Sequence, residues 1–193
     1  MLVPTRQILL GAALVALCTT ASHVGATPLY PLDAGRVEAE LELVVVPWDA
    51  GPELDELDPI VLFGVMGGVQ LGHGLRAQLG LRGDVTDPEA DHVEVVAGLG
   101  WTWVQPTPLD VPPALRVGAR LELGWRWLEL TGSDFILSDD GLTGALSTEV
   151  GLVVFERFAL VARVGAALVS GSNGALPDLQ VQLRTGVAFV GAF

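Results

Sequence analysis

Three glutamates at alternate positions, Glu38, Glu40 and Glu42, are the first residues whose type and spacing could support chemistry. If this segment is an extended strand, successive carboxylates of the series lie about 6 to 7 Å apart on one face. Carboxylates paired in this way can carry out acid–base catalysis. Arginines recur at alternate positions in other segments, however, and a carboxylate that faces an arginine forms an ion pair. We therefore interpret the three glutamates as structural partners of arginines.

Histidine and serine offer a second candidate chemistry, acyl transfer or hydrolysis with histidine as the base. After the first 26 residues the chain has two histidines, and His73 lies in a Gly-His-Gly sequence typical of a turn. His92, next to Asp91, is the one candidate base, and its conceivable nucleophile partners are Ser133, Ser138, Ser170 and Ser172. Neither histidine has a serine or cysteine beside it in a nucleophile motif, so we predict no catalytic residues. The acids between the strands lack the spacing of a calcium loop, and we predict no metal and no cofactor.

Apolar and polar residues alternate with a period of two from about Arg36 to the last residue, and no segment has the period of a long amphipathic helix. In one segment, for example, Val117 and Ala119 alternate with Arg116 and Arg120. Tilted strands of about eleven residues match the thickness of the hydrocarbon layer of a bilayer. The alternation predicts eight strands: Arg36–Val46, Ile60–Leu71, Leu75–Gly83, His92–Val104, Leu115–Leu128, Leu142–Phe155, Phe158–Val169 and Leu179–Phe193.

Alternation alone fits either a soluble barrel or a transmembrane barrel, so other features must decide which face points outward. Most strand glycines share the charged face, and small residues suit the narrow interior of an eight-stranded barrel. Tryptophans lie at the ends of two antiparallel strands, which predicts one pair at each membrane interface: Trp101 with Trp103, and Trp125 with Trp127. We therefore predict that the apolar face meets lipid.

The connections between the predicted strands alternate in character, as those of a transmembrane barrel do. Two of them are tight turns, Gly72-His73-Gly74 and Glu156-Arg157, whereas the Pro-rich segment 105–114 departs from this pattern. The other connections are mostly longer and acidic, and we predict that they are loops on one rim: Pro47–Pro59, Val85–Asp91, Glu129–Gly141 and Ser170–Asp178.

The predicted interior contains more arginines than glutamates, and two interpretations are open. The first is a network of ion pairs that satisfies buried charge, and the second is a pore or gate in which exchanging partners opens a water path. We favour the network, because so narrow a lumen normally has no room for an open channel. The predicted members are Arg36, Glu38, Glu40, Glu42, Arg76, Arg82, Glu94, Arg116, Arg120, Glu122, Arg126, Glu149, Arg163 and Arg184.

The first 26 residues have the order of a secretory signal: one early cation, Arg6, the apolar run Ile8–Cys18, and small residues that end at Ala26. We predict a signal peptide over residues 1–26 and a barrel domain over residues 27–193. Removal of the signal leaves 9 arginines against 23 acids, a formal charge of −14. Such an acidic surface repels phosphates and argues against nucleic acid as a partner.

The last segment resembles the final strand of small outer-membrane β-barrels typified by the OmpA transmembrane domain and the OmpX proteins. In that family a terminal phenylalanine with alternating apolar residues behind it is recognised by the barrel assembly machinery. Val187, Phe189 and Phe193 match this pattern, whereas Thr185 and Gly191 depart from it. The resemblance implies an all-β, up-and-down transmembrane barrel in a Gram-negative outer membrane, in contact with the lipid bilayer and lipopolysaccharide.

The leading hypothesis is a structural or surface-interaction protein of the cell envelope that displays acidic loops and is not an enzyme. A porin-like narrow or gated channel for small solutes is the first alternative. A soluble lipocalin-like carrier, with the apolar face turned inward, is the second, and a lipid-modifying enzyme that uses His92 is the third. The sequence leaves the oligomeric state open.

Overall fold

The computed structural model describes residues 34–46, 59–85, 90–105, 113–131, 136–171 and 179–193. The predicted signal peptide and most residues of the predicted acidic loops lie outside these ranges. None of the described segments forms a helix with the length and apolarity needed to cross a membrane.

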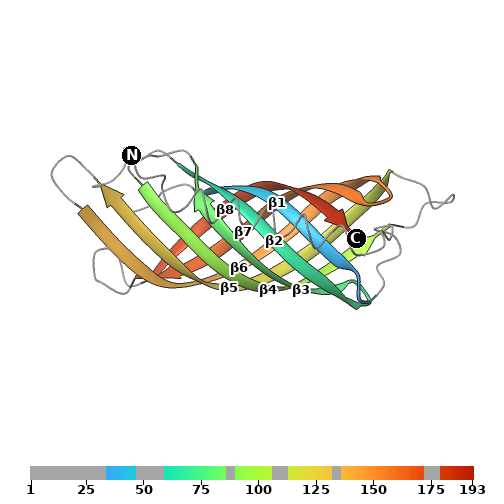
Figure 1. The fold of residues 1–193 in the computed structure, drawn as a ribbon, viewed down its shortest axis with the longest axis horizontal. Helices are drawn as coiled ribbons and strands as arrows, with labels where there is room; N and C mark the ends of the chain where they lie inside the picture. Colours follow the sequence, from blue (N-terminus) through green and yellow to red (C-terminus); the bar gives the residue numbers. More distant parts are fainter. Residues whose placement is uncertain (1–33, 47–58, 86–89, 106–112, 132–135, 172–178) are drawn as a thin grey trace.

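Eight antiparallel strands form one closed barrel, in which each strand pairs with its neighbours in the sequence and the last pairs with the first (Figure 1). Figure 1 shows the strands inclined to the long axis of the barrel. This confirms the predicted up-and-down barrel of eight strands. The strands are β1 (Val37–Val46), β2 (Ile60–Gly72), β3 (Leu75–Asp84), β4 (Ala90–Val104), β5 (Ala114–Thr131), β6 (Ile136–Phe155), β7 (Phe158–Ser170) and β8 (Leu179–Ala192).

The prediction of a loop over Glu129–Gly141 is wrong. Strand β5 continues to Thr131, β6 begins at Ile136, and the pairs Leu128↔Asp139 and Glu129↔Ser138 extend the hairpin. Polar side chains did not end these strands, because backbone hydrogen bonds continue the ladder whatever the side chains are. The other predicted strand ends differ from the observed ends by at most two residues.

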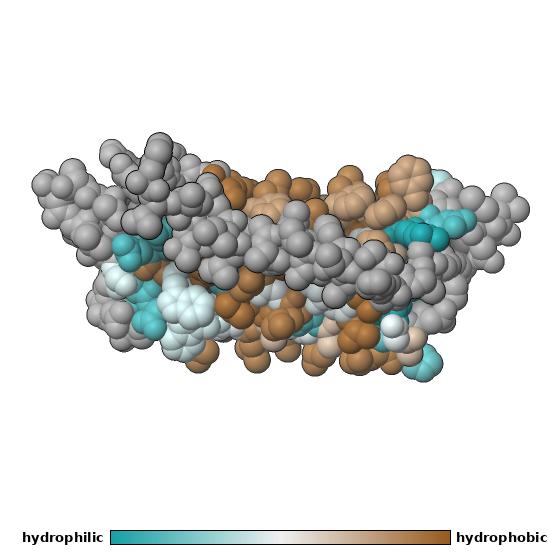
Figure 2. Space-filling view, in the orientation of Figure 1, coloured by the Kyte–Doolittle hydropathy of each residue, from teal (hydrophilic) through white to brown (hydrophobic). Residues whose placement is uncertain are grey.

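The period-two alternation of the sequence separates the two faces of the sheet. On β5, Leu121 and Leu123 are 52% and 66% exposed on the outer surface. The neighbouring Arg120, on the inner face of the same strand, is 2% exposed. Figure 2 shows apolar side chains along the middle of the described surface and hydrophilic residues toward both ends. The apolar face therefore points outward, and the inward-facing arrangement of the lipocalin-like alternative is not adopted.

The two ends of the barrel differ in their connections. The turn end carries the β2–β3 and β6–β7 turns, and the hairpin end is the opposite end, where β5 ends at Thr131 and β6 begins at Ile136 (Figure 1). The β2–β3 turn is tight, as predicted: Gly72, His73 and Gly74 all have positive φ, at 106°, 53° and 77°. A Cβ on Gly74 would lie 2.0 Å from the carbonyl oxygen of Thr102, so this position requires glycine.

Candidate functional site: an ion-pair network in the lumen

At the centre of the lumen, the glutamates of β1 bind arginines from β5 and β7. The Arg163 guanidinium donates to Glu42 at 2.8 Å and to one oxygen of Glu40 at 2.7 Å, and it also bonds the other oxygen of Glu40. From β5, Arg120 donates to Glu42 at 3.1 Å and to Glu40 at 3.2 Å. The glutamate ladder is thus held from two other strands, and the acid–base interpretation receives no support from this geometry.

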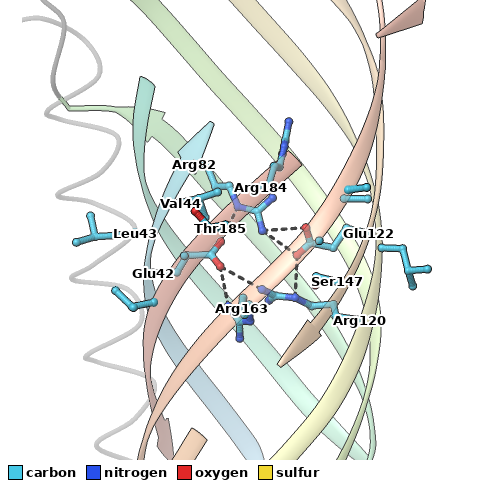
Figure 3. A pocket seen from close by; sticks show the side chains of 16 residues that line it. Glu42, Leu43, Val44, Arg82, Arg120, Glu122, Ser147, Arg163, Arg184 and Thr185 are labelled. Atoms are coloured by element: carbon cyan, nitrogen blue, oxygen red, sulfur yellow. Dashed lines mark hydrogen bonds and ion pairs between the residues drawn. The ribbon is translucent and has the colours of Figure 1, made fainter. Parts of the chain in front are cut away.

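Arg82 of β3 connects this centre to another carboxylate on β5. Its Nη2 lies 2.8 Å from both oxygens of Glu122, and its Nε donates to Glu42 at 2.5 Å. The Nε of Arg120 lies 3.0 Å from an oxygen of Glu122. Figure 3 shows these side chains converging inside the barrel, while Leu43, next to Glu42 in the chain, points away from them. The planar guanidinium suits this role because it can donate to several carboxylates at once.

Toward the turn end, Glu149 of β6 is the most heavily shared acceptor. Arg76 reaches its two oxygens at 2.9 and 2.8 Å, Arg163 approaches at 3.1 and 3.2 Å, and Arg116 at 3.3 Å. Arg76 also donates to Glu38 at 3.3 Å. One carboxylate therefore compensates part of the charge of three arginines on three different strands.

Toward the hairpin end, Glu94 of β4 accepts two hydrogen bonds from Arg184 at 2.7 and 2.9 Å and lies 3.5 Å from Arg82. Arg126 is buried here and donates to Asp139 at 2.9 Å. Arg36, the last of the predicted members, is buried next to the start of β1 at the turn end. The structure thus places all fourteen predicted residues on the inner face of the barrel or at its rim.

Two carboxylates that lie in the lumen were not predicted from the sequence. Asp139 was assigned to a loop, but it is 1% exposed on the inner face of β6, and Asp84 at the end of β3 is 6% exposed. With these two, eight carboxylates accompany eight arginines in the described part of the lumen. The alternation along β3 could have identified Asp84 as a lumen residue, because Asp84 continues the inward-facing series of Arg76, Gln78 and Arg82. Buried charges must be compensated, so this balance explains how the lumen tolerates them.

The ion pairs at the centre of the lumen surround a small cavity. A cavity of about 30 Å³ lies at the centre, bounded by six charged side chains and by a wall of small residues. This volume holds about two water molecules and is far too small for a solute path. The cavity borders Glu42, Arg82, Arg120, Glu122, Arg163 and Arg184 (Figure 3). The small residues that line it include Ala145, Ser147, Gly165 and Gly186.

Buried apolar residues line the lumen toward both ends of the network. One cluster lies toward the turn end and consists of Val104, Ala114, Val153, Ala159, Val161, Ala188, Val190 and Ala192. A second cluster lies toward the hairpin end and consists of Val44, Val46, Ile60 and Leu62. All are at most 9% exposed. Buried apolar side chains therefore flank the network toward both ends of the barrel.

The structure gives His92 a structural partner. Its Nε2 lies 3.1 Å from Glu94 in the lumen. Of the serines considered with it, Ser138 is exposed on the outer face and Ser170 hydrogen-bonds the backbone of Leu142 at 3.0 Å; Ser133 and Ser172 lie outside the described residues. Within the described ranges, no three His, Cys, Asp or Glu side chains are grouped so as to hold a metal ion.

Solved structures with the same architecture identify the fold. Neisserial surface protein A matches with a TM-score of 0.54 and 14% identity, over 82% of this chain and 96% of that chain. The N-terminal β-barrel domain of Pseudomonas aeruginosa OprF matches with a TM-score of 0.55 and 14% identity, over 82% of this chain and 99% of that one. The fold is that of a small outer-membrane β-barrel. No protein-family model matches the sequence, and no curated protein is significantly similar to it.

In an outer-membrane barrel the lipid-facing band lies between two aromatic girdles. Trp101 and Trp103 are 49% and 43% exposed at the turn end of β4, and Trp125 and Trp127 are 36% and 47% exposed toward the hairpin end of β5. Beyond Trp127 the outer face of β5 becomes polar with the exposed Glu129. The apolar stretch of β5, residues 115–127, spans about 40 Å along the strand and roughly 30 Å along the axis of a barrel of ordinary tilt. That height matches the hydrocarbon layer.

Two residues of the predicted assembly signal lie on the outer face of β8, and the third, Phe193, follows the strand directly. Val187 and Phe189 are 51% and 44% exposed, and Phe193 is half-buried. The backbone of Phe193 exchanges two hydrogen bonds with Val37, at 2.9 and 3.3 Å, and so continues the seam between β8 and β1. The sequence did not indicate a partner for these rings, but the structure stacks Phe189 on Phe158 of β7.

Proposed function

We propose that this protein is an exported barrel of a Gram-negative-type outer membrane, where it has a structural or surface-interaction role and performs no catalysis. The signal sequence of residues 1–26 directs export, and the apolar outer face anchors the barrel in lipid. The hairpin end faces outward from the cell, and the lumen is closed.

The ion-pair network in the lumen is the observation that carries this proposal. Arginines and carboxylates bond one another across the described part of the lumen, and the cavity at their centre is about 30 Å³. A rigid, closed barrel suits a protein that acts through its surface rather than by transport. No arrangement of His92 with a nucleophile among the described residues supports a reaction.

The proposed partners follow from the surface. The apolar band with its tryptophan girdles suits the lipid bilayer, and the hairpin end lies at the height of lipopolysaccharide head groups if the barrel has the usual orientation. The alternating last strand suits the barrel assembly machinery. The acidic surface argues against nucleic acid.

Conductance across a planar bilayer tests the closed lumen. Purified, folded protein inserted into the bilayer should give no steady openings, since the ion pairs fill the path between the two apolar clusters. Reproducible single-channel steps from the wild-type protein would overturn the proposal.

A narrow or gated channel is the second candidate, favoured by the continuous polar network and its central cavity. If it is correct, the wild-type protein conducts, and Arg120→Ala or Glu122→Ala changes or abolishes the openings because both residues border the cavity. Glu156→Gln, on the exposed β6–β7 turn, is the matched control and should leave any conductance unchanged.

A further inference from the structure

The outer face of β8 has a gap near its end. The residues on this face alternate with lumen residues, and Gly191 occupies the position between Phe189 and Phe193. Gly191 has no side chain to contribute, yet it is buried although it lies on the outward face. Another residue must therefore cover it.

Phe158, the first residue of β7, provides this cover. It pairs directly with Gly191 across the β7–β8 ladder. A Cβ built on Gly191 would lie 3.2 Å from the ring of Phe158 and 3.2 Å from the ring of Phe193, so the two rings close over the glycine. Phe158 also stacks on Phe189, with ring centroids 5.2 Å apart and an interplanar angle of 18°. An aromatic ring that covers a cross-strand glycine is a known means of pinning strand register.

The cluster of these three rings borders the seam at which the barrel closes. Strands β1 and β8 lie at opposite ends of the barrel sequence, with pairs such as Glu38↔Ala192. Because loop-closure entropy and slow non-local pairing penalise such contacts, we expect this seam to form last. Until then the edge of β8 is unpaired, and an unpaired apolar edge needs a partner that pairs with it.

We infer that the segment recognised by the assembly machinery is this two-strand aromatic cluster, Phe158, Phe189 and Phe193, and not the last strand alone. Phe158 supplies from β7 the apolar group that Gly191 lacks on β8. This inference rests on the proposed function, because it assumes that the protein is assembled by that machinery.

Assembly of the urea-unfolded full chain into vesicles, with and without purified assembly machinery, tests the inference. Phe158→Ala should lower the folded yield several-fold when the machinery is present and much less when it is absent. The matched control is Phe155→Ala, which removes a 67% exposed ring at the same turn that lies on β6 and not beside β8. It should behave as the wild type in both arms.

The reciprocal variant separates recognition from simple packing. Phe158→Ala combined with Gly191→Phe returns a ring to the same place from β8, and it should restore machinery-dependent assembly. Equal losses for Phe158→Ala in both arms, no loss at all, or no rescue by the double variant would overturn the inference. If the wild-type chain itself gains nothing from the machinery, the inference is overturned, whereas the proposed closed barrel is tested separately by its conductance.

Discussion

Glu149 illustrates how individual residues hold the lumen together. It contacts Arg76, Arg116 and Arg163 from three strands and lies in a space where its side chain is 1% exposed. A charge in such a place depends on its partners, because removing one partner leaves another buried charge uncompensated. The contribution of the network is therefore greatest at the residues with the most partners.

Replacement of Glu149 should destabilise the barrel strongly. Glu149→Gln keeps the shape of the side chain and removes its charge, so three arginines lose a shared anion. We predict that the free energy of unfolding falls by about 3 to 5 kcal/mol, the usual cost of breaking a buried ion pair. Urea unfolding of the protein in lipid vesicles, followed by tryptophan fluorescence, measures the change.

Glu156→Gln is the matched control for this experiment, because Glu156 is exposed on the β6–β7 turn. A surface substitution of this kind should change the free energy of unfolding by no more than about 0.5 kcal/mol. Equal effects of the two variants would contradict the assignment of Glu149 to a buried network.

At the scale of the strand, the outward alternation can be tested by charge placement. Leu121 is 52% exposed midway along the apolar stretch of β5, and Leu179 is 62% exposed at the first residue of β8, at the hairpin end. We predict that Leu121→Arg costs about 2 to 4 kcal/mol of folding free energy in lipid and Leu179→Arg about 0 to 1 kcal/mol, as expected for the midplane and the interface.

Unfolding of both variants in lipid vesicles measures these costs, and the comparison is sharp because both leucines are exposed by more than half. If the outer surface faced water, the two arginines would be equally harmless. That result would contradict the membrane-facing assignment of the apolar side chains.

Strand phase made most of the fold predictable. Alternation of apolar and polar residues identified the eight strands and the inner face, since each strand must separate lipid from lumen. The alternation did not predict the strand residues between Glu129 and Gly141. Outside the bilayer a strand needs no apolar face, and here hydrogen bonding alone continues the hairpin. The error also hid Asp139, the partner of Arg126.

The pairing within the lumen could not be predicted from the sequence. Arg163 and Glu40 are 123 residues apart and meet across the barrel, and which arginine reaches which glutamate depends on strand register and tilt. Similarly, the last strand showed Gly191 only as a departure from the family pattern. The register with β7, which brings Phe158 over it, is a property of the folded sheet.

At the scale of the whole molecule, the eight strands form a closed wall whose interior is largely charged and whose exterior is largely apolar. The interior contains balanced charge between two apolar clusters, and the exterior is an apolar band between aromatic girdles. This arrangement is stable only where lipid covers the outside, because so much exposed apolar surface would otherwise drive aggregation.

The most direct test of this account is the gel migration of the protein in an outer-membrane fraction from cells that express the full chain, with and without boiling. A closed barrel held by the network should resist detergent when unheated, so the account predicts a band that shifts on boiling and is extracted only with detergent. A protein found in the soluble periplasmic fraction, with the same migration before and after heating, would contradict it.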